Sequence, residues 1–238
     1  MSSTGRSRHI EQVLEHQMRE WEMRRRLNEE GGESARGELA HLPEGPWISI
    51  SKQLGAEALE VAESLHGRLG WQVFDKEIIE SIARETHTRE RVLSRMDERA
   101  VSRFDDWLEQ LLVPDQPPQM TYLQQMAKVI WALAKQGRVI LLGRGANWFL
   151  DNRYGLRVRA IAPIGVRIRR VSEREKIPEK DAGRRVRAAD ASRAAFIRQV
   201  YHRDIDDPLG YDLVVNTETL GAEAAADAVF AALKTKLG

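Results

Sequence analysis

The sequence contains no cysteine in its 238 residues. Without cysteine there are no disulfide bonds, no cysteine-ligated zinc and no thiol nucleophile, and the composition agrees with a reducing compartment. The sequence also contains no stretch of eighteen continuous apolar residues, and its polar N-terminal part contains no signal-peptide core. These absences predict a soluble, cytoplasmic protein with no membrane partner.

An excess of charge of either sign is absent too. The chain has 37 Lys and Arg residues against 36 Asp and Glu residues, which gives a formal net charge of +1. Such a balance provides no case for bulk nucleic-acid binding by the whole molecule. Hydrophobic residues make up 42% of the chain, enough for a sizeable core. The length predicts one compact α/β domain with an appendage, or two small domains.

Residues 1–46 differ in composition from the rest of the chain. Apolar residues recur there at three- and four-residue steps, as on one face of an amphipathic helix, at Ile10, Val13, Leu14, Met18 and Trp21. A linker rich in Gly, Glu and Pro follows. We therefore predict an N-terminal helical arm and linker. The arm is either solvated or docks through residues 9–27 on a protein partner or on a second copy of the chain.

From Trp47 onwards, strand patterns alternate with helical patterns. The strand patterns, the third of which ends in a glycine turn, cover 47–51, 70–75, 138–145, 156–163 and 211–217. The helical patterns cover 56–69, 76–86, most of 88–135, 165–203 and 221–236. Strands separated by helices predict an α/β protein with a mainly parallel sheet and right-handed crossovers. Ligands of such sheets bind at the carboxyl ends of the strands.

Polar residues gather at those strand ends. The positions are Ser51, Lys52, Gln53, Asp75, Lys76, Gly143, Arg144, Gly145, Asn216 and Thr217. Asp75 emerges directly at a strand end, where it either binds a hydroxyl or amine of a ligand or caps the helix that begins at Lys76. Arg144 stands between two glycines, so its planar guanidinium either grips a phosphate or is exposed in an ordinary glycine turn.

The first strand leads into a loop around Gly55 and then into a helix. A strand, a glycine turn and a helix N-terminus together form a common cradle for phosphate, because backbone N–H groups and the helix dipole point at the anion. The standard phosphate loop reads G-x-x-x-x-G-K-[ST]. The stretch SKQLGAEAL has one glycine, no following lysine and no Ser or Thr for Mg²⁺. It is therefore either a phosphate loop with altered chemistry or an ordinary strand–helix turn.

The segment 165–203 carries a local surplus of positive charge, with twelve Lys and Arg residues against five Asp and Glu residues. Arginines that close over a substrate supply the positioning and charge neutralisation on which phosphoryl transfer depends. A nucleic-acid patch is the competing interpretation, but few aromatic residues for stacking accompany it, namely Phe196 and Tyr201. A solvated basic helix is the third interpretation.

These pieces, taken in order, resemble the cytidylate-kinase-like family of P-loop nucleoside monophosphate kinases. The matching stretches are ISISKQLGAEALEVAESLHGRLGWQVFDKEII, VILLGRGANWFL, RVRAIAPIGVRIRRV and DASRAAFIRQVYHRDIDDPLGYDLVVNTETL. The resemblance covers about 47–82 and 138–232. It implies a three-layer P-loop kinase-like fold for 47–238, with a five-stranded, mainly parallel sheet flanked by helices and an Arg-rich lid at 165–203. Residues 88–135 are then a helical insertion or an acceptor-binding region.

The resemblance also implies an activity and a set of site residues. It implies transfer of a phosphoryl group from ATP, with Mg²⁺, to a nucleoside monophosphate such as CMP. The residues expected to be catalytic are Lys52, Arg144, Arg170 and Arg193. The residues expected to bind ATP are Ser51, Gln53, Gly55 and Ala56. The residues expected to bind the acceptor are Asp75, Arg144, Asp190 and Arg198, and no residue is expected to bind a metal directly.

The loop departs from the pattern of this family. Relatives of this branch tend to read S-R-Q-x-G-S-G-G, whereas here Glu57 replaces a glycine and Ala58 stands where the kinase lysine would be. A carboxylate close to the β- and γ-phosphates repels them, and Lys52 is the candidate for the missing cation. An alternative function is therefore a catalytically impaired nucleotide sensor or scaffold that acts through the N-terminal arm.

Overall fold

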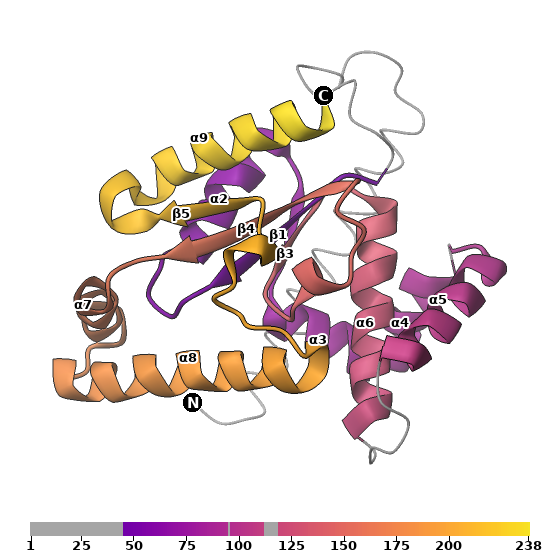
Figure 1. Cartoon of the computed structure of the whole chain (residues 1–238), viewed down its shortest axis with the longest axis horizontal. Coiled ribbons are helices and arrows are strands. Elements are labelled where there is room, and N and C mark those ends of the chain that lie inside the picture. The colour runs from indigo at the N-terminus through magenta and orange to yellow at the C-terminus, as the bar shows by residue number, and fades with distance from the viewer. Residues whose placement is uncertain (1–44, 95, 112–118) are drawn as a thin grey trace. The chain divides into compact units, whose positions relative to one another are not determined.

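The computed structural model describes residues 45–94, 96–111 and 119–238 (Figure 1). The predicted arm and its partner-binding segment, residues 9–27, lie outside the described residues. The described chain divides into two compact units. One consists mainly of residues 74–139, and the other of residues 47–73 together with 140–237. Within the described residues, no helix is long and apolar enough to cross a membrane.

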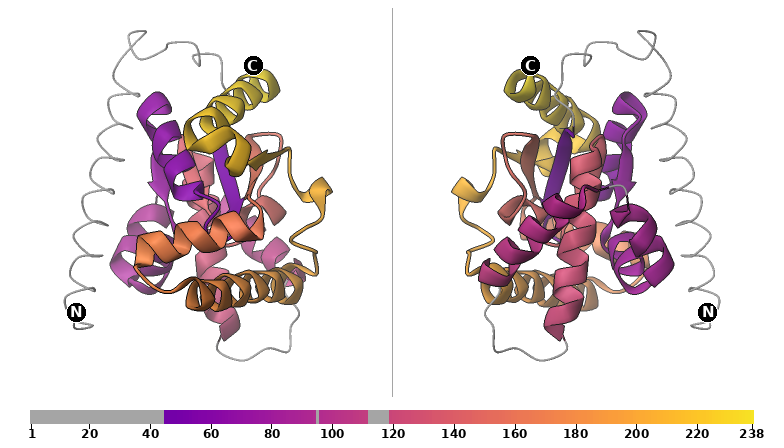
Figure 2. Two further views of the ribbon diagram at one scale, coloured as in Figure 1. Left: turned by 90° about the vertical axis from the view of Figure 1, so that its left-hand side faces the viewer. Right: turned by 90° about the vertical axis from the view of Figure 1, so that its right-hand side faces the viewer.

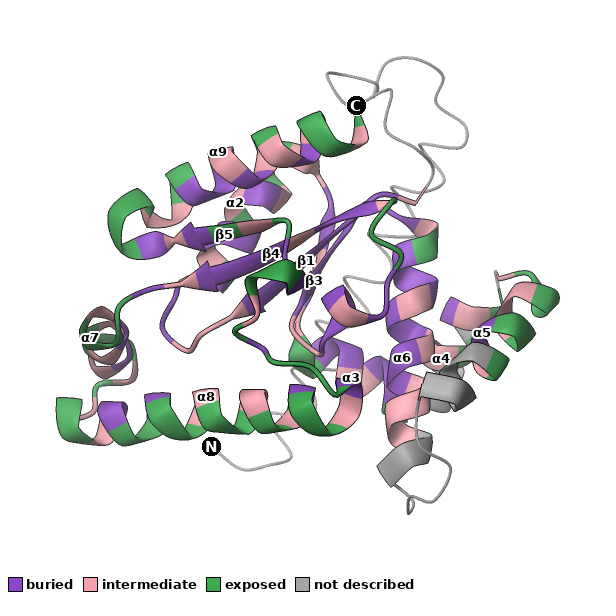
Figure 3. Cartoon of the chain, viewed as in Figure 1, coloured by how far each residue is buried: buried purple, intermediate pink, exposed green. Residues whose placement is uncertain are grey.

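The described strands form one five-stranded sheet with the order β2-β3-β1-β4-β5. The strands are β1 (Trp47–Lys52), β2 (Gln72–Phe74), β3 (Val139–Leu142), β4 (Gly155–Ile161) and β5 (Leu213–Asn216). β1 pairs in parallel with β4, which places Ser51 opposite Arg159, and β4 pairs in parallel with β5. Most strand residues are buried (Figure 3). The predicted parallel sheet flanked by helices is confirmed.

Four α-helices belong to the unit formed by 47–73 and 140–237 in the described chain. They are α2 (Ala58–Leu69), α7 (Ile164–Glu175), α8 (Glu179–Tyr201) and α9 (Thr217–Leu237), with short 3₁₀ helices at Ala146–Trp148 and Pro208–Gly210. Helices α2 and α9 lie side by side (Figure 1). Arg68 of α2 joins them through ion pairs with Glu223 and Asp227 of α9.

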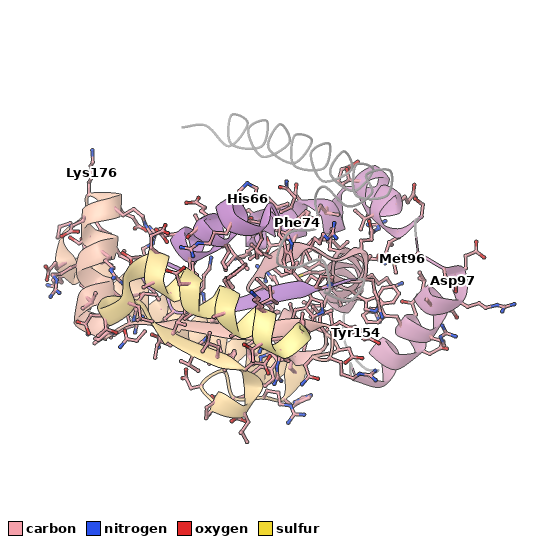
Figure 4. The ribbon with its side chains drawn as sticks, turned by 90° about the horizontal axis from the view of Figure 1, so that it is seen from above. His66, Phe74, Met96, Asp97, Tyr154 and Lys176 are labelled. Atoms are coloured by element: carbon pink, nitrogen blue, oxygen red, sulfur yellow. The ribbon has the colours of Figure 1, made fainter. Side chains whose placement is uncertain are left out.

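The predicted basic stretch 165–203 forms two helices rather than one. Helix α7 ends at Glu175, and the next residue, Lys176, is left-handed (φ 55°) with a side chain that points outward (Figure 4). Pro178 precedes α8 and breaks the helix because it has no N–H group and restricts the residue before it. The two helices pack on each other (Figure 2). Their shared apolar core is Val171, Ala182 and Val186, with Leu54, Ile168 and Ile177 packed against it.

The unit of residues 74–139 is helical, as predicted for most of 88–135. Its helices are α3 (Lys76–Arg84), α4 (Thr86–Leu93), α5 (Glu98–Leu111) and α6 (Gln119–Gln136). Helix α3 packs against α6, and Ile79 of α3 and Leu133 of α6 are fully buried. Phe104 of α5 stacks on Trp131 of α6 with ring centroids 4.6 Å apart. The proline-containing break between α5 and α6 lies outside the described residues.

Candidate functional site

The loop between β1 and α2, residues 53–57, packs against the C-terminal end of β4. Gln53 donates its backbone N–H to Ala160 O at 3.2 Å, and its side-chain Oε1 accepts from the Ala162 amide at 3.2 Å. Ala56 is fully buried, and its amide donates back to Gln53 O. Gln53 and Ala56 therefore shape the loop, and their contact with ATP stays a prediction.

An arginine and an aspartate from α7 and α8 hold the backbone of this loop. The Leu54 amide donates to Asp190 Oδ1 at 3.1 Å. Arg167 Nη1 donates to Asp190 Oδ2 at 2.5 Å and to Leu54 O at 3.3 Å, while its Nε donates to Ala162 O at 2.8 Å. Arg167 is only 5% exposed. Asp190, predicted to bind the acceptor, thus has a structural partner on each of its two oxygens.

Gly55 leaves no room for a side chain at the centre of the loop. It is left-handed (φ 84°), and a Cβ there would lie 2.7 Å from Arg167 O and 3.0 Å from Arg167 Cα. We expect Gly55→Ala to lower the free energy of unfolding by about 2 kcal/mol, because positive-φ strain adds to a backbone clash.

The matched control is Gly67→Ala in α2, where a methyl group meets open space. Alanine in a helix interior is expected to stabilise the protein by about 0.5–1 kcal/mol. Urea denaturation measures both variants. If Gly55→Ala unfolded at the urea concentration of the unmodified protein, the close approach of Arg167 to the loop would be contradicted.

Glu57 places a negative charge at the end of the loop. It precedes α2 in a left-handed conformation (φ 49°, ψ 31°), and its carboxylate pairs with Arg170 Nη2 at 2.9 Å. Arg170 also donates to Gly55 O at 3.4 Å and to buried Thr217, at 3.0 Å to both Oγ1 and the backbone O. Arg170, predicted to be catalytic, therefore neutralises an acidic side chain at the loop and joins the loop to the start of α9.

The N-terminus of α2 offers backbone N–H groups beside the loop. The first intrahelical bond of α2 runs from Val61 N to Glu57 O at 3.0 Å. The amides of Ala58, Leu59 and Glu60 precede this bond, so they need acceptors from outside the helix. The positive end of the helix dipole favours an anion at this place. The loop thus keeps two physical elements of a phosphate cradle, although its lysine position holds Ala58.

Arg159 of β4, which the sequence analysis did not select, forms a buried network at the end of β1. It is 5% exposed, and its guanidinium donates to Ser51 Oγ and Asp206 Oδ1, both at 2.8 Å. Tyr211 OH donates to Ile205 O at 2.7 Å and lies 3.4 Å from Ser51 Oγ. Burial raises the pKa of the Tyr211 phenol. A charged residue within an apolar strand pattern is the signal that could have identified Arg159.

Arg193 of α8 lies beside the same strand end. Its Nη1 donates to Lys52 O at 3.3 Å and lies 3.6 Å from Asp190 Oδ1. Burial lowers the pKa of Arg193; the Asp190 charge opposes this shift, whereas the charges of Arg159 and Arg167 add to it. Like charges gathered in a partly buried place are stabilised by a bound anion. The structure thus brings Lys52, Asp190 and Arg193 together.

Arg144 follows β3 in a turn that approaches α8. Its carbonyl oxygen accepts from Tyr201 OH at 2.9 Å, and its guanidinium carbon lies 5.5 Å above the centre of the Phe196 ring. Burial lowers the pKa of Arg144, although the Tyr201 phenol opposes this effect. Arginine nevertheless remains charged at neutral pH. Arg144 is thus a partly buried cation at a strand end, and its binding of a phosphate stays a prediction.

The two other predicted acceptor residues have different surroundings. Asp75 belongs to the unit of residues 74–139, where its Oδ1 accepts from Ile78 N at 2.9 Å. The expected cap of α3 is therefore confirmed, and ligand binding by Asp75 stays a prediction. Arg198 is exposed on α8. It lines an open pocket of about 340 Å³ whose other members are His202, Arg203 and Asp204. Across the described ranges, no three His, Asp or Glu side chains are grouped to hold a metal ion.

These features define the class of the protein. In the described chain, the first strand of a parallel sheet of order β2-β3-β1-β4-β5 runs through a glycine turn into a helix N-terminus. Arginines from β4, α7 and α8 surround that turn. This is the arrangement of a P-loop kinase-like α/β protein. The chain belongs to the cytidylate kinase-like family, whose profile matches residues 47–219, and the predicted resemblance is confirmed.

Individual relatives cover part of the chain. The cytidylate kinase of Methanocaldococcus jannaschii is 35% identical over 104 residues, which cover 42% of this chain and 58% of the relative. That of Pyrococcus horikoshii is 34% identical over 104 residues, which cover 44% and 52%. The chain thus spans about half the length of these curated relatives. A solved structure of an uncharacterized protein from Eubacterium ventriosum shares the fold, with a TM-score of 0.66, 19% identity and coverage of 81% of this chain and 99% of that chain.

Proposed function

We propose that this protein is a nucleoside monophosphate kinase that transfers the γ-phosphoryl group of ATP to a nucleotide such as CMP. The observation that carries the proposal is a set of guanidinium groups gathered around the β1–α2 loop of a family member. The set consists of Arg159, Arg167, Arg170 and Arg193. Catalysis of phosphoryl transfer is largely positioning and neutralisation of phosphate charge, which these groups and the α2 N-terminus are suited to provide.

In this proposal the donor and acceptor phosphates bind to different parts of the chain. The donor phosphates lie against the loop and the first amides of α2, with Lys52 and Arg193 beside the transferring group. Arg144 holds the phosphate of the acceptor. An oxygen of that phosphate attacks the γ-phosphorus, and the bond from the γ-phosphorus to the β–γ bridging oxygen breaks. The bridging oxygen keeps the electron pair and leaves with ADP, and the acceptor becomes a nucleoside diphosphate.

Mg²⁺ enters this proposal as the ion that accompanies ATP. The carboxylates near the loop are Glu57, Asp190 and Asp206, and each pairs with an arginine. Their surroundings suit the orientation of guanidinium groups better than direct coordination of a cation. Phosphate oxygens and water are ligands that Mg²⁺ prefers in nucleotide sites. When bound, the ion supplies further neutralisation of phosphate charge.

The proposal is tested by coupled measurement of ADP release with ATP, Mg²⁺ and each of CMP, dCMP, UMP, AMP and GMP. We expect turnover that depends on one acceptor, and we expect Arg144→Ala to lower kcat/KM for that acceptor by about 10²–10³-fold. Arg153→Ala is the matched control, because Arg153 is an exposed arginine of the same unit that pairs with Asp151. Folded protein that releases no acceptor-dependent ADP would overturn the kinase proposal.

A second candidate function is a nucleotide sensor or scaffold that acts through the arm of residues 9–27. Glu57 and Ala58 favour it, since a carboxylate at the loop and the absence of the kinase lysine both reduce the neutralisation of phosphate charge on which transfer depends. Calorimetric titration of ATP and CMP into the same protein separates the two functions. Binding of nucleotide without turnover would support the sensor function, whereas turnover would exclude a catalytically inactive sensor. A folded protein that neither binds nor reacts would contradict both.

A further inference from the structure

The turn that carries Arg144 has a backbone conformation that needs support from outside the turn. Gly143, Arg144 and Gly145 are left-handed in succession, with φ of 83°, 57° and 70°. Glycine adopts this region freely, but a residue with a Cβ atom such as arginine does so rarely. Contacts from elsewhere in the fold therefore have to favour this conformation of Arg144.

Tyr201, in the last turn of α8, supplies such a contact. Its hydroxyl donates to Arg144 O at 2.9 Å, and its ring packs so closely on Gly145 that a Cβ at that position would overlap it. Phe149 stacks with the same ring, with centroids 6.1 Å apart. Tyr201 is 8% exposed. The packing of its ring therefore directs the hydroxyl at the Arg144 carbonyl.

Phe196, five residues earlier on α8, contacts the side chain of the same arginine. The Arg144 guanidinium carbon lies 5.5 Å from the centre of the Phe196 ring, within the range of a cation–π interaction. Phe196 also meets Tyr201 edge to face, with centroids 6.0 Å apart. The two aromatic residues thus form one support that holds the backbone and the guanidinium of Arg144.

The same helix holds the loop proposed for ATP. Asp190 accepts from the Leu54 amide, and Arg193 donates to Lys52 O. We propose that Tyr201 and Phe196 are positioning residues that fix Arg144 for the phosphate of the acceptor nucleotide. This inference rests on the proposed function. Helix α8 then sets the distance between the donor loop and the acceptor arginine, which governs how often the reacting oxygens and phosphorus meet in line.

The kinetic test uses variants that keep the shape of the aromatic support. Tyr201→Phe removes the hydroxyl alone, Phe196→Leu removes the ring face, and Phe196→Tyr keeps it. We expect Tyr201→Phe and Phe196→Leu each to raise KM for CMP about five- to tenfold while KM for ATP stays within twofold, and Phe196→Tyr to restore the acceptor KM. Tyr154→Phe, which removes the hydroxyl from a ring that lies under the Arg153 guanidinium, is the matched control and is expected to change neither constant.

A double-mutant cycle and a ligand-free spectrum decide the outcome. If Tyr201 acts through Arg144, Tyr201→Phe has no further effect on kcat/KM in the Arg144→Ala background. Losses of kcat/KM that multiply, or equal rises in both KM values, would overturn the positioning role.

The Arg144 Nε–H resonance of ¹⁵N-labelled protein reports the surroundings of the guanidinium when no nucleotide is present. If Tyr201→Phe and Phe196→Leu shift this resonance and Tyr154→Phe does not, the two aromatic residues do position Arg144. That conclusion holds even if CMP neither binds nor reacts, a result that would overturn only the proposed acceptor nucleotide. An unchanged resonance overturns the inference.

Discussion

Asp190→Ala is expected to lower the free energy of unfolding by about 2–3 kcal/mol, less than the cost of about 3–5 kcal/mol for a fully buried ion pair, because the Asp190 side chain is 28% exposed. The carboxylate holds Arg167 at 2.5 Å and the Leu54 amide at 3.1 Å. The side chain of Arg167 is 6% exposed. Alanine at 190 would leave this guanidinium without its carboxylate and the loop amide without its acceptor, and buried unpaired polar groups are destabilising. Urea denaturation followed by circular dichroism measures the change.

A control on the same helix separates this effect from the loss of an ordinary ion pair. Asp181 pairs with Arg184 in the first turns of α8, where the two side chains are 44% and 73% exposed. Asp181→Ala is expected to change stability by less than about 0.5 kcal/mol. Asp190→Asn, which keeps one oxygen acceptor, is expected to fall between the two. If Asp190→Ala were as stable as Asp181→Ala, the contacts of Asp190 with Arg167 and the Leu54 amide would contribute nothing to the free energy of unfolding.

Glu57→Gln is expected to lower KM for ATP about tenfold, which corresponds to about 1.4 kcal/mol of binding free energy. The substitution removes a carboxylate from the start of α2 and releases Arg170 from its ion pair. The substitution raises the net charge at the loop by one and leaves the Arg170 guanidinium to face a phosphate. Two charges 4 Å apart interact by about 1 kcal/mol in water and about 4 kcal/mol near a protein surface. Initial rates at varied ATP, together with calorimetric binding of ADP, measure the effect.

Two further variants identify the cause of the expected change in KM for ATP. Glu57→Gly removes the charge and also relieves the left-handed backbone at φ 49°, so it is expected to bind ATP as Glu57→Gln does and to be about 1 kcal/mol more stable. Glu63→Gln removes an exposed carboxylate farther along α2 and is expected to leave KM unchanged. If Glu57→Gln bound ADP no better than Glu63→Gln, the Glu57 carboxylate would not face the phosphates.

The arrangement of elements could be predicted because local patterns determine it. Apolar residues such as Ile48 and Ile50 mark a buried strand, and Gly70 ends α2 in the left-handed conformation that glycine favours. The sequence predicts a helix from 221, and the main part of α9 does begin there, because Gly221 is non-helical (φ 67°) and separates it from a short helical turn that starts at Thr217. That preceding turn was not predicted, and the hydrogen bonds of Thr217 with Arg170 hold it.

The partners of the site residues could not be predicted from local patterns. The basic stretch offers many arginines, and their spacing does not say which of them reach the loop. The Leu54 amide and Asp190 are separated by 136 residues of sequence, so their contact depends on how the whole unit folds. The same holds for Ser51 and Arg159, which meet because β1 and β4 pair in one register. The sequence therefore identified candidate residues but not the pairs that they form.

Helix α8 contacts the loop near its middle, through Asp190, and the Arg144 turn at its last residue, Tyr201, and this limits how the chain can change in length. Asp190 and Tyr201 are 201 − 190 = 11 residues apart, and an α-helix turns by about 100° per residue, so both point to nearly the same side after about three turns. One inserted or deleted residue between them would rotate one end by about 100° against the other. Alignments of related chains should therefore run without gaps from 190 to 201.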